Sequence, residues 1–157
     1  MARQLNVNLK LLVFDMDGTI ADLYGVDDWC NKLNSSNPTP YIEAEPMWNM
    51  AELAETLSAL KAIGYRVVIT SWLAMNSTKA YADEVRTAKL NWLETHNFPY
   101  DEIHMVQYGT TKANCTRYHE CEQILFDDNE KVRNGWSLGE TVDPTTTNII
   151  DYLKALL

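Results

Sequence analysis

Asp15 and Asp17 lie two positions apart, directly after the apolar run from Leu11 to Phe14. Alternation along an extended chain turns both side chains to one side, so one carboxylate can attack as a nucleophile while its neighbour gives and takes a proton. A magnesium ion can offset their mutual repulsion, and Gly18 lets the backbone turn sharply. An acidic turn exposed to water is the alternative, because Asp-Gly is common in ordinary turns.

Two later segments carry groups that complement such a pair in a phosphoryl-transfer site. The hydroxyl of Thr70 or Ser71, at the end of a second apolar run, can hydrogen-bond a phosphoryl oxygen, although a helix cap or loop would use the same side chains. Lys112 lies at the start of an expected helix, where its ammonium can balance the Asp15 carboxylate and a phosphate together. Most lysines, by contrast, are solvated surface charges.

Asp127 and Asp128 directly follow the apolar run from Ile124 to Phe126. Two adjacent acids at the end of a buried strand can converge with Asp15 on a hard cation that prefers oxygen ligands, such as Mg²⁺. A helix N-terminus with favourable negative charge is the alternative interpretation. The order of these groups along the chain favours the metal site.

The patterns between these residues predict strands that alternate with helices. Strands are expected at residues 11–14, 65–70, 103–106 and 124–126, and helices at 48–63, through 81–93, at 111–118 and at 146–157. Short connections between such elements predict an α/β fold with a central parallel sheet covered on both faces. The polar groups at the carboxyl ends of the strands would then meet at one edge of the sheet.

The 157 residues can bury one good core but are short for two independent domains, so we expect a single domain over residues 1–157. Turn-forming residues crowd between the first strand and the first long helix, which predicts a small cap insertion at about residues 22–48. Aromatic side chains in or beside this segment can stack on a nucleobase or pack in the core. They are Tyr24, Trp29, Tyr41, Trp48 and Trp72.

The formal net charge of −9 and the pI near 4.7 argue against a broad basic surface for duplex nucleic acid. A local cationic pocket could still hold one phosphate. The short apolar run near the N-terminus lacks the length and flanks of a signal peptide or a membrane span. We therefore expect a cytoplasmic protein that binds a small phosphorylated molecule and no membrane.

The three cysteines, Cys30, Cys115 and Cys121, give an odd count at spacings unlike a disulfide framework, so reduced thiols are expected. Cys115, His119 and Cys121 lie close enough in sequence to suggest zinc. A fourth ligand and the usual Cys-x-x-Cys spacing are missing, and ordinary helix positions are the better interpretation.

The order Asp-x-Asp-Gly-Thr, then a strand-end Thr or Ser, then Lys, then Asp-Asp resembles the four motifs of the haloacid dehalogenase-like superfamily. The resemblance spans Leu11 to about Trp136 and implies a Rossmann-like three-layer fold with Mg²⁺ as cofactor. It implies Asp15 as nucleophile and metal ligand, and Asp17 as general acid/base with its backbone carbonyl on the metal. Asp127 would be a direct metal ligand, and Asp128 would orient the metal shell.

The reaction implied is phosphomonoester hydrolysis through an aspartyl phosphate on Asp15, with Lys112 and Mg²⁺ neutralising the developing charge. Asp17 favours a phosphatase over a dehalogenase, because an alkoxide leaving group requires an acid that a halide does not. The Thr70-Ser71 and Phe126-Asp127-Asp128 segments are most similar to the small 5′(3′)-deoxyribonucleotidase-like members.

That similarity implies a nucleoside monophosphate as substrate. Three alternatives stay open from the sequence. The enzyme could act on the phosphorylated ends of nucleic acids or on sugar phosphates, or the chain could be a non-catalytic binding module that keeps the fold as a scaffold.

Overall fold

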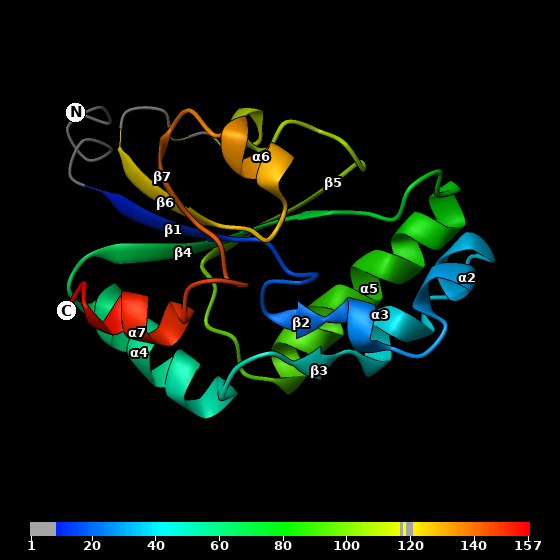
Figure 1. Cartoon of the computed structure of the whole chain (residues 1–157), viewed down its shortest axis with the longest axis horizontal. Helices are drawn as coiled ribbons and strands as arrows, with labels where there is room; N and C mark the ends of the chain where they lie inside the picture. The colour runs from blue at the N-terminus through cyan, green and yellow to red at the C-terminus, as the bar shows by residue number, and fades with distance from the viewer. Residues whose placement is uncertain (1–8, 117, 119–120) are drawn as a thin grey trace.

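The computed structural model describes residues 9–116, 118 and 121–157. Its centre is a parallel sheet in the order β5-β4-β1-β6-β7, with helices on both sides (Figure 1). The strands are β1 (Lys10–Phe14), β4 (Tyr65–Trp72), β5 (Glu102–Val106), β6 (Glu122–Phe126) and β7 (Gly139–Val142). The predicted α/β fold with a central parallel sheet is confirmed, and it is Rossmann-like.

β1 is the central strand, and its sequence shows why. Residues 11–14 are all buried, as a strand covered on both faces of a parallel sheet requires. Phe14, the last residue of β1, pairs with Ile69 of β4 on one side and Phe126 of β6 on the other. The residues that follow these three therefore leave the sheet at the same level.

Three helices cover one face of the sheet and bury its larger core. They are α4 (Met50–Ala62), α5 (Lys79–Thr95) and α7 (Ile149–Lys154). Each begins at a residue whose side chain accepts a backbone N–H of the first turn, namely Asn49, Thr78 and Asn148. The other face carries α6 (Glu130–Asn134), the 3-10 helix η2 (Lys112–Asn114) and the connections around them.

The segment from residue 21 to residue 46, here called the insertion, lies beside α5 rather than on the sheet (Figure 1). It contains β2 (Ala21–Asp22), the 3-10 helix η1 (Leu23–Gly25), α2 (Trp29–Asn34), α3 (Thr39–Glu43) and β3 (Glu45–Pro46). Leu23 and Tyr41 of the insertion form an apolar cluster with Tyr81, Val85 and Ala88 of α5. Through this cluster the insertion is packed against the first half of α5.

The sheet has one strand that was not predicted, and one expected helix is absent from the described residues. Strand β7 was not predicted, because it is an edge strand with only Val142 buried and shows no apolar run. Gly139 begins it where a Cβ would collide with the carbonyl of Gln123. In the range 111–118, the part of the chain that the structure describes forms only the short 3-10 helix η2, and the expected α-helix is absent there.

Of the helices that the structure describes, none has both the length and the apolar character needed to cross a membrane.

Candidate active site

The turn after β1 brings its acidic residues into a fixed arrangement. The amides of Thr19, Ile20 and Ala21 all donate to the carbonyl of Met16, which closes the chain into a tight turn. Gly18 has a φ of +80°, and a Cβ there would collide with the carboxylate of Asp128. Glycine is therefore required at this position for both backbone conformation and space.

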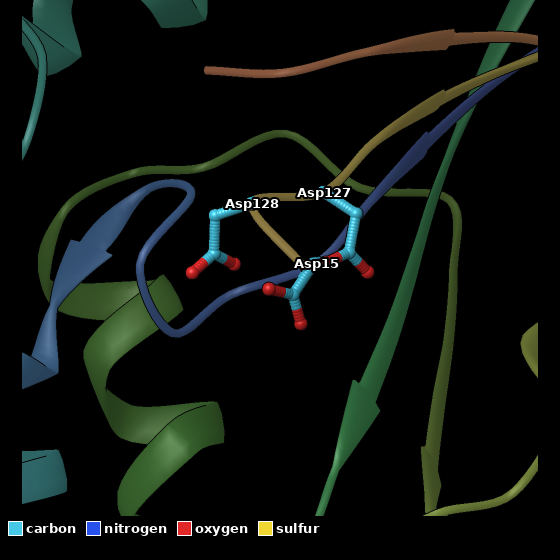
Figure 2. Close-up of side chains that lie close together, drawn as sticks. All are labelled: Asp15, Asp127 and Asp128. Atoms are coloured by element: carbon cyan, nitrogen blue, oxygen red, sulfur yellow. The ribbon is translucent and has the colours of Figure 1, made fainter. Parts of the chain in front are cut away.

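Three carboxylates converge at the carboxyl ends of β1 and β6 (Figure 2). Asp15, Asp127 and Asp128 each offer an oxygen, and these oxygens lie within 4.8 Å of one another. The hydroxyl of Thr19, which is fully buried, lies 3.2 Å from Oδ2 of Asp15 and 3.3 Å from Oδ1 of Asp128. As the sequence predicted, the fold brings the three acids together, and the Thr19 hydroxyl lies between Asp15 and Asp128.

Electrostatics in this cluster favour a bound cation. Burial raises the pKa of Asp127 to about 6 and the pKa of Asp128 to about 8, and the nearby charge of Asp15 adds to both shifts. A divalent cation would favour the ionised form of both buried carboxylates and offset their repulsion with Asp15. Carboxylate oxygens are the ligands that Mg²⁺ and other hard cations prefer, so the donor set fits the implied metal.

Lys112 bridges two of these acids. Its Nζ donates to Oδ1 of Asp15 at 2.9 Å and to Oδ2 of Asp127 at 2.7 Å, and the residue is only 4% exposed. Burial alone would lower the pKa of Lys112, but the two carboxylates outweigh it and the pKa is raised. The lysine thus stays charged beside the proposed nucleophile, and its Nζ lies 5.4 Å from the centroid of the Trp72 ring.

The two candidate hydroxyls of β4 lie at the level of Asp15, since they follow Ile69 in the paired register. Both Thr70 and Ser71 are buried, and neither lines the cavity described below. Ser71 Oγ accepts a hydrogen bond from Lys89 Nζ at 2.6 Å. The structure therefore turns the Ser71 hydroxyl toward a residue that we had not singled out in the sequence.

Lys89 is that residue, and it lies within the buried face of α5. It is 1% exposed, and besides Ser71 its Nζ donates to Oδ2 of Asp17 and to the backbone carbonyl of Trp72, each at 2.8 Å. A signal for it was present in the sequence, because Lys89 interrupts the apolar stripe Val85, Ala88 and Trp92 at a position that faces the core.

Asp17 lines the cavity described below, with its side chain 17% exposed. Burial raises its pKa above the ordinary value, and Lys89 works in the opposite direction. A raised pKa favours the protonated form, which is the form that a general acid needs.

A cavity of about 350 Å³ opens over these groups. Its floor holds Asp15, Asp17, Lys112, Asp127 and Asp128, and its walls are mostly apolar and aromatic. The wall residues include Leu23, Tyr24, Trp29, Leu33, Tyr41, Trp72, Leu73, Met75, Tyr108 and Val132. A larger cavity of about 560 Å³ lies between α3 and α5, but none of the predicted site residues lines it.

The weaker zinc hypothesis cannot be followed to a site. His119 lies outside the described residues, and Cys115 and Cys121 are not part of the acidic cluster. Within the described part of the chain all three cysteines are free thiols, as expected.

No family model and no curated protein matches the sequence. Among solved structures, the chain is similar to the crystal structure of D,D-heptose 1,7-bisphosphate phosphatase from Burkholderia thailandensis, with a TM-score of 0.51 and 15% sequence identity. The match covers 92% of this chain and 98% of that chain. At this identity the likeness establishes the fold, and the chemistry has to be argued from the side chains at the strand ends.

Proposed function

We propose that this protein is a magnesium-dependent phosphomonoesterase of the haloacid dehalogenase-like type. The observation that carries the proposal is the convergence of Asp15 with Lys112, Asp127 and Asp128 on the floor of one cavity, with Asp17 two positions further along the same turn. The fold shared with a structure named as a sugar-bisphosphate phosphatase supports the same class of reaction.

The residues divide the work of hydrolysis between them. An Asp15 oxygen attacks phosphorus, the bond to the ester oxygen breaks, and Asp17 gives its proton to the departing alcohol. Water then attacks the aspartyl phosphate, Asp17 takes up the proton of that water, and inorganic phosphate leaves with Asp15 restored. Lys112 lies against Asp15 throughout, where it offsets negative charge on the phosphoryl group.

The metal-binding groups in this proposal are Asp15, Asp127, Asp128 and the backbone carbonyl of Asp17. When bound there, Mg²⁺ would supply further positive charge next to the phosphoryl oxygens. Thr19 orients two of the ligands, since its hydroxyl lies within hydrogen-bond distance of both Asp15 and Asp128.

For the substrate we propose a nucleoside monophosphate. Two aromatic pairs line the cavity: Tyr24 with Trp29 from the insertion, and Trp72 with Tyr108 from the sheet side, each with ring centroids 4.9 Å apart. Tyr24 and Tyr108 are half exposed, so part of each side chain is accessible to a ligand. Aromatic faces that remain accessible beside a phosphate site can stack on a flat base.

Sugar phosphates are the competing substrate class, because the structural neighbour is named for a heptose bisphosphate. Among the described residues that line the cavity, Lys112 is the only cation, so the second phosphate of a bisphosphate would find no charged partner there. Mostly apolar walls also offer few partners for sugar hydroxyls. The net charge of −9 weighs against long nucleic acids as substrates.

Phosphate release by purified protein tests the proposal across nucleoside monophosphates, sugar mono- and bisphosphates and 3′-phosphorylated oligonucleotides, with Mg²⁺ or with a chelator. We expect turnover that requires Mg²⁺ and is highest for a nucleoside monophosphate. High turnover of sugar phosphates with silence on nucleotides would contradict the substrate. Magnesium binding without turnover of any ester would favour a binding module.

A further inference from the structure

Lys89 is a buried lysine that the proposed reaction does not use directly. It reaches the end of β4 and the turn after β1 from the middle of α5, more than 70 residues away in sequence from Asp17. The ring of Tyr41, from the insertion, lies 5.1 Å from its Nζ. Lys89 therefore touches three separate parts of the molecule at once.

The three hydrogen bonds of Lys89 define what it can do. An ammonium has three N–H donors, and Asp17, Ser71 and the Trp72 carbonyl accept one each at 2.6 to 2.8 Å. No donor is left for a substrate phosphate, and Lys89 does not line the cavity. A direct role in binding the phosphoryl group is therefore excluded by its own contacts.

Its contact with Asp17 is specific to one oxygen. Lys89 holds Oδ2, while no hydrogen bond from the described residues holds Oδ1, and Asp17 lines the cavity. Two neutral acceptors on β4 fix Lys89 itself, so the carboxylate is tied to the sheet rather than to a mobile side chain. One oxygen of Asp17 is anchored and the other is presented to the site.

We propose that Lys89 is a positioning residue, which holds the Asp17 carboxylate so that its Oδ1 meets the ester oxygen of the substrate. This inference rests on the proposed phosphatase function and adds a residue to it. It predicts that Lys89 matters most when the leaving group needs a proton. A lysine that only filled a core position would instead affect all esters alike.

Esters that differ in leaving group separate these two roles. An alkyl phosphate needs proton donation to its poor leaving group, whereas an aryl phosphate with electron-withdrawing substituents leaves without it. We expect Lys89→Met to lower kcat/KM about 100-fold or more on the alkyl ester and only a few-fold on the activated aryl ester. Asp17→Asn should show the same pattern, and the double variant should lose no more than Asp17→Asn alone.

Lys61→Met is the matched control, because Lys61 also pairs with a carboxylate, Asp101, but at the end of α4 away from the cavity. It should leave both esters unaffected. The magnesium-dependent rise in melting temperature should survive in Lys89→Met, which reports a folded protein with an intact acidic cluster. If Lys89→Met does not fold, Lys89→Gln takes its place, because its amide keeps one donor toward Asp17. The same two esters then decide between the positioning role and a core-filling role.

Equal losses on the alkyl and aryl esters would overturn the positioning role while leaving the phosphatase intact. A selective loss in Asp17→Asn that is absent in Lys89→Met would overturn it as well. A wild-type protein that hydrolyses neither ester would refute the proposed function, and the role of Lys89 would fall with it.

Discussion

Two buried lysines meet the acidic turn after β1, and they have different partners. Lys112, from the connection between β5 and β6, bridges Asp15 and Asp127, two of the acids in the candidate metal site. Lys89, from α5, meets Asp17 together with a hydroxyl and a backbone carbonyl. Both side chains are almost completely buried, so burial alone does not distinguish them.

The difference between their acceptors indicates different roles. Lys112 places positive charge where negative charge gathers during phosphoryl transfer, which should matter for every ester. Lys89 donates its three N–H groups to fixed groups of the protein and so positions Asp17. This should matter only where Asp17 must donate a proton. The acceptors around a buried lysine are thus a better guide to its role than its charge.

The contrast between the lysines assumes that Asp15 is the nucleophile, and Asp15→Asn should have the largest effect. We expect phosphate release to fall by more than about 10³-fold, because an amide cannot form the acyl phosphate. Rapid quenching with labelled substrate should trap a hydroxylamine-sensitive phosphoprotein in the wild type and none in the variant. Asp27→Asn makes the same chemical change at an exposed residue of the insertion and should behave as wild type.

A phosphoprotein that still forms in Asp15→Asn would move the nucleophile elsewhere. The roles of both lysines would then have to be reassigned.

Replacing Lys112 sharpens the contrast directly. Lys112→Met should lower kcat/KM by about 10²- to 10³-fold on alkyl and activated aryl esters alike, because charge on the phosphoryl group is common to both. Steady-state rates at saturating Mg²⁺ measure this. A loss confined to the alkyl ester would mean that Lys112 and Lys89 act through the same step, contrary to the division of roles proposed above.

The sequence predicted the contacts of Lys112 with the acidic cluster better than the contact of Lys89 with Asp17, for a physical reason. Asp15 and Asp127 directly follow the ends of two neighbouring parallel strands, and such strands bring these residues together whatever the helices do. Lys112 comes from the connection after β5 and meets both acids. Lys89 reaches the site only because α5 packs at a particular rotation against β4. Helix rotation and insertion packing depend on tertiary contacts, which local patterns do not contain.

The strands also divide into those that local patterns predict and those that depend on tertiary contacts. The buried strands β1, β4 and β6 contain apolar runs, so they were predicted. The edge strand β7 exposes three of its four residues and has no such run. Its place beside β6 depends on the close approach of Gly139 to the Gln123 backbone, which is visible only in three dimensions.

Magnesium should stabilise the folded protein in a pH-dependent manner, through the acidic cluster beside Lys112. Asp127 and Asp128 have pKa values raised from 3.8 to about 6 and about 8, so the metal-free native state binds more protons than the unfolded state across that window. Its free energy of unfolding should therefore fall as pH rises from about 5 to about 8. Mg²⁺ binds the ionised acids, and we expect it to raise the melting temperature more at about pH 8 than at about pH 5.5.

Melting curves with MgCl₂ or a chelator at the two pH values measure this effect. Asp128→Asn should flatten the pH dependence of the metal-free protein, because it removes the group with the larger shift. Equal stabilisation by Mg²⁺ at both pH values would argue that the metal binds elsewhere.

The smallest expected effect tests whether the contact between Lys89 and Asp17 is sensitive to any change in α5. Trp92 lies one turn beyond Lys89, and its indole Nε1 donates to the carbonyl of Ala44 in the insertion at 2.8 Å. Trp92→Phe leaves that buried carbonyl without its donor, so we expect a loss of about 1–2 kcal/mol in the free energy of unfolding, measured by urea titration. Because neither Trp92 nor Ala44 lines the cavity that Asp17 lines, the ratio of kcat/KM values for alkyl and aryl esters should stay within about twofold of wild type. A ratio shifted as in Lys89→Met would mean that loosening α5 against the insertion is enough to disturb Asp17. The specific hydrogen bond from Lys89 would then no longer be needed to explain the selective loss in Lys89→Met.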